Sequence, residues 1–145
     1  MKPCVYINKP CVFCAYASKQ IEREFVYEDD QVVAFYSKSP AALKHLLVVP
    51  RAHIGTVNDL SATHLGLLKH MEVVGKKQLD EMVGHDRTEN QSLYGFHVPP
   101  FNSVDHLHLH CFVLPFLSGF KQLKYLPKTP WFCTLTDLMQ KLQRN

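Results

Sequence analysis

The stretch His106-Leu107-His108-Leu109-His110 places three imidazoles at alternate positions, with a leucine between each pair. Successive side chains of a β-strand point to opposite faces of the sheet, so the three histidines would share one face. The leucines would share the other face with Cys111 and Val113, and that face suits a hydrophobic core. The stretch therefore predicts a strand over Val104–Leu114 that is anchored in a core and presents imidazoles to a pocket. Near neutral pH, imidazole can act as nucleophile, acid, base or metal ligand.

Length and composition limit the possible classes of protein. The 145 residues fit a single domain over 1–145, and 46% of them are hydrophobic. The net charge is +3, with Lys and Arg scattered, so we expect a small anionic ligand and no nucleic acid. No apolar stretch approaches the roughly 20 residues of a membrane helix, and residues 1–10 lack the apolar core of a signal peptide. We therefore expect no membrane association.

The cysteine count bears on the compartment. Five cysteines, an odd number in an apparently unexported chain, argue against a disulfide framework and for a reducing environment. This predicts an intracellular protein, cytoplasmic or nuclear, with a peroxisomal location left open.

Hydrophobic periodicity predicts the elements around the histidine strand. Apolar residues recur at helical spacing over Ser61–Val83, where Asp59 or Ser61 can cap a long helix. The other expected elements are strands at Phe25–Tyr27, Val32–Ser37, Lys44–Val49 and Ser92–Val98, a short helix at Val12–Gln20, a polar loop at His85–Gln91 and a final helix to Arg144 capped by Thr134 or Thr136. Strands clustered around a long helix predict an α+β domain. Its antiparallel sheet would have about five strands, with one long helix and a shorter one.

The histidine strand fits covalent chemistry at phosphorus. A neutral imidazole can attack phosphorus and hold the transferred group as a phosphoramidate. A second group must protonate the leaving amine or oxygen, and polar groups must neutralise charge on the phosphate oxygens. Asn102 and Ser103 lie on the turn just before the strand and suit that last task. His45, on another predicted strand, is a fourth candidate for the pocket.

A second motif, Cys11-Val12-Phe13-Cys14, offers two thiolates to one metal ion. Two cysteines supply only half of a tetrahedral zinc shell, so a buried cysteine pair is the alternative interpretation. A redox role is not expected, because the chain shows no βαβ pattern around the motif.

At these residues the chain resembles the histidine-triad (HIT) family, and within it the Hint branch. The family signature is matched by His106-Leu107-His108-Leu109-His110-Cys111-Phe112, and upstream segments 27–30, 33–35 and 45–54 agree. The segment 95–103 looks like the third Hint branch and its plant relatives. The similarity covers about residues 11–114 and implies a single HIT domain with a HIT-like fold. A C-terminal extension with a helix follows over about 115–145.

This resemblance implies a nucleotide hydrolase or transferase. The enzyme would cleave the P–N bond of adenosine 5′-phosphoramidates to AMP through a covalent AMP-histidine intermediate. The implied catalytic residues are the nucleophile His108, with His110, His106, His45 and Ser103. The implied nucleotide-binding residues are Asn102, Ser103, His108, His110, Phe13, Phe35, Ser37, Val12 and His97. Ser37 stands where the family usually has an aspartate that holds the ribose, which puts ribose affinity in question.

The resemblance also implies a structural zinc ion, held by Cys11, Cys14, His53 and His106, no organic cofactor, and a homodimer. The expected small-molecule partners are purine nucleoside 5′-phosphate derivatives: AMP, phosphoramidates and adenosine 5′-phosphosulfate. Hydrolysis or phosphorolysis of adenosine 5′-phosphosulfate, as by an adenylylsulfatase, is one alternative function, and a non-catalytic nucleotide-binding scaffold is another. A dinucleoside polyphosphate hydrolase and a zinc-dependent nucleic-acid binder rank lower.

Overall fold

The computed structural model describes residues 11–84 and 91–144. Residues 1–10 with Cys4, most of the predicted loop at His85–Gln91, and Asn145 lie outside these ranges. The described elements are α1 (Val12–Ala17), β1 (Tyr27–Glu28), β2 (Val32–Tyr36), β3 (Ala42–Pro50), the 3₁₀ turns η1 (Val57–Asp59) and η2 (Ala62–His64), α2 (Leu65–Val83), β4 (Ser92–His97), β5 (Leu109–Phe116), α3 (Gly119–Lys124), β6 (Phe132–Thr134) and α4 (Leu135–Arg144). Among the described helices, none combines the length and apolar character needed to cross a bilayer.

The strands form one antiparallel sheet in the order β1-β2-β3-β5-β4-β6. This confirms the α+β class, but the sheet has six strands where about five were expected. The additional strand is β6, from the C-terminal extension, which pairs with β4. Gly95 makes this close pairing possible, because a Cβ atom there would lie only 2.4 Å from Cζ of Phe132.

One face of the sheet packs against α2 and carries the main hydrophobic core. Leu46 and Val48 of β3 and Leu109 and Cys111 of β5 point to this face and are fully buried. Gly75 brings α2 close to β5, since a Cβ atom at that position would lie 2.8 Å from Sγ of Cys111. The leucine side of the histidine motif therefore lies in a core, as its alternation predicts.

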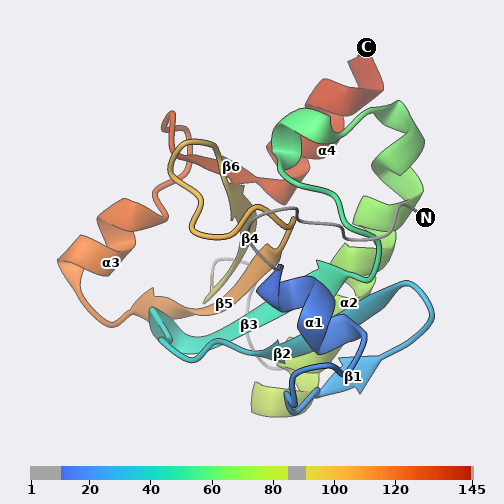
Figure 1. Ribbon diagram of the computed structural model, residues 1–145. Coiled ribbons are helices and arrows are strands. Elements are labelled where there is room, and N and C mark those ends of the chain that lie inside the picture. The colour runs from blue at the N-terminus through green and yellow to red at the C-terminus, as the bar shows by residue number, and fades with distance from the viewer. Residues whose placement is uncertain (1–10, 85–90, 145) are drawn as a thin grey trace.

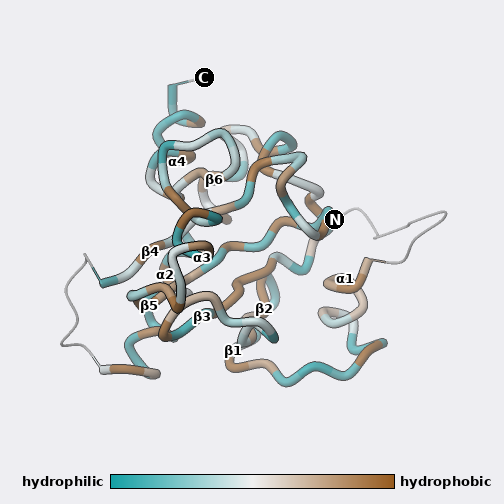
Figure 2. Tube along the Cα trace, turned by 90° about the vertical axis from the view of Figure 1, so that its left-hand side faces the viewer, coloured by the Kyte–Doolittle hydropathy of each residue, from teal (hydrophilic) through white to brown (hydrophobic). Residues whose placement is uncertain are grey.

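The opposite face carries the histidines between two smaller clusters. At one end α1 lies across the sheet on the side away from α2 (Figure 1), and Phe13 packs with Phe35. At the other end Tyr125, after α3, packs with Phe112 of β5 and Phe132 of β6. The connection from α1 to β1 is largely hydrophilic (Figure 2) and exposed. The arrangement leaves the imidazoles in the middle of this face.

Several predicted boundaries differ from the observed ones. The strand expected over Val104–Leu114 begins only at Leu109. Before that point the chain no longer pairs with β3, because the Leu107 N–H donates to the Ile54 carbonyl at 2.6 Å. The long helix begins at Leu65, after a 3₁₀ turn capped at Ser61, and the short helix ends at Ala17. Helix α3 was not predicted.

Candidate active site and metal cluster

His108 is held in one tautomer by the backbone. Its Nδ1 lies 2.7 Å from the carbonyl oxygen of His106, which can only accept a hydrogen bond. Nδ1 therefore carries the proton, and Nε2 keeps its lone pair. The described residues provide no hydrogen-bond partner for Nε2. An imidazole with a free, unprotonated Nε2 is in the form that a nucleophile needs.

His45 and His110 form a hydrogen-bonded pair whose protons can also be placed. The Ala41 N–H donates to Nδ1 of His45 at 3.1 Å, so the proton of neutral His45 is on Nε2. That Nε2–H donates to Nδ1 of His110 at 2.9 Å, which leaves His110 protonated on Nε2. Nε2 of His110 is buried and has no partner in the described residues. A buried donor without a partner is rare and costly, so this N–H indicates a site for a ligand acceptor.

Burial keeps these imidazoles neutral. It lowers the pKa of His45 to about 3 and that of His106 to about 4. Burial likewise places the pKa of His108 below, and that of His110 well below, the ordinary histidine value. At pH 7 the pocket therefore offers a free lone pair on His108 and an N–H donor on His110, and the two ring centroids are 4.9 Å apart.

Four side chains predicted to bind zinc converge at one point. The ligand atoms of Cys11, Cys14, His53 and His106 all lie within 4.8 Å of one another. Nδ1 of His106 is 3.3 Å from each cysteine Sγ and 3.2 Å from Nδ1 of His53. Sγ of Cys14 is 3.4 Å from Nδ1 of His53. The cluster joins α1, the loop after β3 and the start of the histidine motif.

The cluster passes a geometric test for zinc. Zn–N bonds of about 2.0–2.1 Å and Zn–S bonds of about 2.3 Å place tetrahedral ligand atoms roughly 3.3–3.8 Å apart. Four of the six distances between the ligand atoms are 3.2–3.4 Å and lie close to that range, and the other two are no longer than 4.8 Å. Nε2 of His106 donates to the Pro50 carbonyl at 2.8 Å, which leaves the Nδ1 lone pair facing the thiols. The donor set and its tautomer therefore suit a four-coordinate zinc ion.

Aromatic residues border His108 on the α1 side. The Phe13 ring meets the His108 ring edge-on, with centroids 5.1 Å apart, and lies 5.7 Å from the Phe35 ring. Val12, beside Phe13 in α1, is partly buried in the same cluster. The structure therefore brings together three residues predicted to contact a nucleotide base, next to His108.

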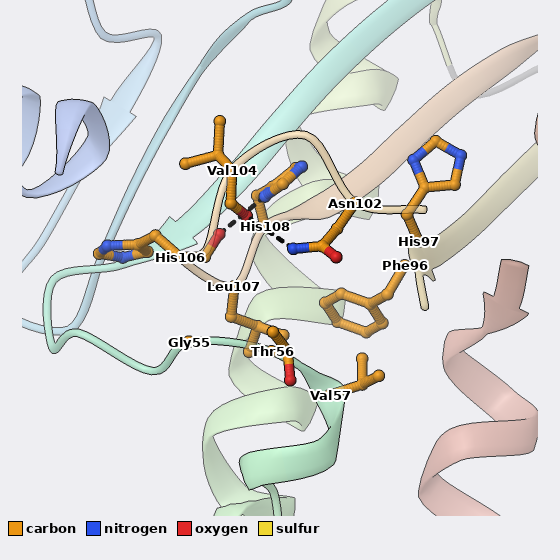
Figure 3. A pocket seen from close by; sticks show the side chains of 10 residues that line it. All are labelled: Gly55, Thr56, Val57, Phe96, His97, Asn102, Val104, His106, Leu107 and His108. Carbon is orange, nitrogen blue, oxygen red and sulfur yellow. Dashed lines mark hydrogen bonds between the residues drawn. The ribbon is translucent and has the colours of Figure 1, made fainter. Parts of the chain in front are cut away.

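The polar residues expected around the phosphate and ribose divide into two groups. Asn102 lines a cavity together with His97 and His108 (Figure 3), and its amide donates to Oδ1 of Asp105 at 2.7 Å. Ser103 is exposed on the same turn and does not line this cavity. Ser37 lines a different cavity with Tyr36, and its hydroxyl accepts from the Ser39 N–H at 3.3 Å. The ribose contact predicted for Ser37 thus stays a prediction.

His97 has neighbours that the sequence did not predict. Its Nε2 lies 3.0 Å from the Lys124 carbonyl oxygen, and its ring stacks on Tyr125 with centroids 4.7 Å apart. Tyr125 is 5% exposed and also meets the His110 ring at 5.2 Å. Sequence reasoning missed Tyr125 because it lies in the extension, outside every recognised motif. The local sequence shows only an aromatic residue among charged and apolar neighbours, a pattern that many core residues share and that does not indicate a functional site.

The described fold and its histidine arrangement define a protein of the HIT class. Residues 10–125 match the family described as "Scavenger mRNA decapping enzyme C-term binding". A solved "HIT family hydrolase from Legionella pneumophila Philadelphia 1" superposes with a TM-score of 0.67 at 30% identity, covering 75% of this chain and 96% of that one.

Two relatives are similar over nearly the whole chain. "Bifunctional adenosine 5′-phosphosulfate phosphorylase/adenylylsulfatase HINT4" of Arabidopsis thaliana is 39% identical over 94% of both chains. "Adenosine 5′-monophosphoramidase HINT3" of Mus musculus is 39% identical over 92% of this chain and 82% of that protein. The chain belongs to the histidine-triad family, in its Hint branch.

Proposed function

We propose that this protein is an adenylyl-transferring hydrolase that cleaves adenosine 5′-phosphoramidates to AMP. The observation that carries the proposal is the pair of proton positions at the pocket. His108 presents an unprotonated Nε2, and His110 presents an Nε2–H without a partner, with the rings 4.9 Å apart. One group suits attack on the α-phosphorus, and the other suits donation to a phosphate oxygen on which charge builds up.

The reaction would proceed in two displacements. Nε2 of His108 forms a bond to the α-phosphorus as the P–N bond breaks, and the electron pair leaves with the amine, which takes up a proton from solvent. Water then attacks the phosphorus, the bond to His108 breaks, and AMP departs. The His106 carbonyl keeps the proton on Nδ1 of His108 throughout, so Nε2 is returned ready for another turnover. Phe13 and Phe35 would hold the base beside the nucleophile.

Adenosine 5′-phosphosulfate is the second candidate substrate. The relative of Arabidopsis thaliana that covers 94% of both chains is named for that activity. The same nucleophile serves either substrate, because both carry an α-phosphorus attached to a leaving group. The difference would lie in the group that receives the electron pair, an amine in one case and sulfate in the other.

The test is AMP release from adenosine 5′-phosphoramidate and from adenosine 5′-phosphosulfate, with wild type and His108→Ala compared. We expect the variant to lose on the order of 10⁴–10⁶-fold, as when a nucleophile is removed. His64→Ala, in η2 and away from the pocket, is the matched control and should retain wild-type turnover. The preferred substrate decides between the two candidates. Wild type that binds AMP but turns over neither compound would refute catalysis and favour a nucleotide-binding scaffold.

The proposal includes a structural zinc ion on Cys11, Cys14, His53 and His106. A closed four-ligand shell has no open position for substrate, so the metal would join α1 to the sheet and hold the backbone of His106. Native mass spectrometry should show one zinc per chain. Retention of zinc by a Cys11→Ser, Cys14→Ser double variant would contradict the assignment. The homodimer that the resemblance implies stays a prediction, which light scattering checks.

A further inference from the structure

The proton of each histidine around the pocket can be placed from its hydrogen bonds. Among these described histidines, one ring besides His108 keeps an unprotonated nitrogen without a partner. His45 has its Nδ1 occupied by the Ala41 N–H and gives its Nε2–H to His110. His110 uses its Nδ1 to accept that proton, so its other nitrogen is a donor. His106 gives Nε2–H to Pro50 and turns its Nδ1 to the cysteines. None of these three rings can accept a proton from a substrate without giving up an existing contact.

His97 differs from these three rings. Its Nε2–H donates to the Lys124 carbonyl, which fixes the lone pair on Nδ1. Among the described residues, Nδ1 of His97 has no hydrogen-bond partner. His97 is one of the residues that line the same cavity as His108 and Asn102 (Figure 3), and its ring lies 5.1 Å from the His110 ring. It is therefore a neutral base held next to the reacting groups.

Burial and the Lys124 ammonium lower the pKa of His97, but two of its contacts would bind the imidazolium that forms during turnover. The Lys124 carbonyl accepts from Nε2–H and would bind the imidazolium more tightly than the neutral ring. The stacked Tyr125 ring presents a π face, which attracts a cation. Both contacts come from the C-terminal extension, so this segment would contribute to chemistry as well as to packing.

We propose that His97 is a catalytic residue, the general base that activates the second nucleophile. This inference rests on the proposed function. As water attacks the adenylylated His108, a water proton would pass to Nδ1 of His97 while the new P–O bond forms. The P–N bond to His108 breaks, and its electron pair returns to Nε2 of that ring. His97 then releases this proton to solvent and is again a neutral base, so protons balance over the cycle.

The test separates formation of the intermediate from its breakdown. His97→Gln places an amide where Nε2 was, so it can still donate to the Lys124 carbonyl, but it has no base. We expect steady-state AMP release to fall by about 10²-fold, the size of a lost general base. Amine release from a fluorescent adenosine 5′-phosphoramidate should then show a burst of one equivalent per site. Alkaline quenching and intact mass spectrometry should detect the adenylylated protein.

Fluoride provides a readout that a structural role would not change. Fluoride carries no proton, so its attack on the adenylylated His108 needs no base and yields adenosine 5′-fluorophosphate. We expect fluoride to restore turnover of His97→Gln toward the wild-type rate. Phe132→Leu, which disturbs the packing 5.7 Å from the His97 ring but leaves the base in place, is the control. It should show neither burst nor fluoride rescue.

Two results would count against the proposal in different ways. Equal slowing of amine and AMP release in His97→Gln, without a burst and without fluoride rescue, would show that His97 only supports the fold. Wild type that releases no AMP from any adenylyl substrate would refute the proposed function, and this inference with it.

Discussion

Replacing Gly95 by alanine should detach or strain the sixth strand. Gly95 lies in the middle of β4, opposite His110 of β5 on one side and Thr134 of β6 on the other. An added Cβ would stand 2.4 Å from Cζ and 2.6 Å from Cε2 of Phe132, and 2.7 Å from the Cys133 carbonyl oxygen. The Phe132 ring could rotate, but the carbonyl belongs to the backbone. Relief therefore requires β6 to move.

The cost can be worked from either way of relieving the clash. If β6 stays in place, overpacking of this kind costs about 1–3 kcal/mol. If β6 leaves, Phe132, which is 1% exposed, loses its burial, worth about 1.5–3 kcal/mol. Both routes lower the free energy of unfolding by about 2 kcal/mol. Turnover should also fall, because Phe132 packs against both His97 and Tyr125.

Urea unfolding at 25 °C, with free zinc held constant, measures this change. Gly66→Ala is the matched control, since no atom lies within 4 Å of its added Cβ and the residue is in α2. Alanine in a helix should leave stability unchanged or raise it by up to about 1 kcal/mol. A Gly95→Ala protein with the wild-type urea midpoint and wild-type turnover would refute the close packing of β6 on β4.

Three further changes test other parts of the structure. Burial alone would raise the pKa of Asp29. Four hydrogen bonds to its carboxylate outweigh this effect and lower the pKa; the donors are the backbone N–H groups of Gln31 and Val32, the Tyr27 hydroxyl and the His70 ring. Asp29→Asn should therefore cost about 1–2 kcal/mol at pH 7, and urea titrations should show this gap closing as pH falls below about 4, through the folded pKa. Equal gaps at pH 7 and pH 3 would contradict it. Burial lowers the pKa of His45 to about 3, so the unfolded chain, with a histidine pKa near 6.5, binds the proton first. The free energy of unfolding should therefore fall as pH drops from about 6.5 toward 3. In His45→Gln, the slope of unfolding free energy against pH in this range should be smaller by the equivalent of about one bound proton. His53→Ala removes one of the four clustered ligands, and competition with a chelator should show zinc affinity reduced by at least about 10²-fold. Unchanged affinity would place the metal elsewhere.

The core side of the fold could be predicted because it depends on local alternation. Leu109 and Cys111 alternate with histidines, and both are fully buried against α2, as a period of two requires. The long helix follows from apolar spacing in the same way, apart from its first turn. The four zinc-ligand candidates could also be chosen by family resemblance, and the fold brings them within 4.8 Å.

The remainder of the site depends on partners that are distant in sequence. Leu107 leaves the sheet because Ile54, from the loop after β3, accepts its N–H. No local sequence pattern predicts that the histidine motif stops pairing with β3 before Leu109. Strand β6 is only three residues long, and its close approach to β4 is possible because Gly95 has no Cβ atom. His97 could be identified as a pocket residue, but its base character depends on Lys124, 27 residues away.

His106 connects the Cys/His cluster to His108 through three different atoms. Its Nδ1 faces the thiols of Cys11 and Cys14, its Nε2–H donates to Pro50, and its carbonyl oxygen accepts the Nδ1–H of His108. A shift of His106 would therefore move the acceptor that fixes the tautomer of the nucleophile. We therefore expect the first histidine of the motif to have a positioning role, whereas His108 presents the free lone pair. Under the proposed function, this division of atoms would let two buried histidines of one motif serve a metal and a reaction at the same time.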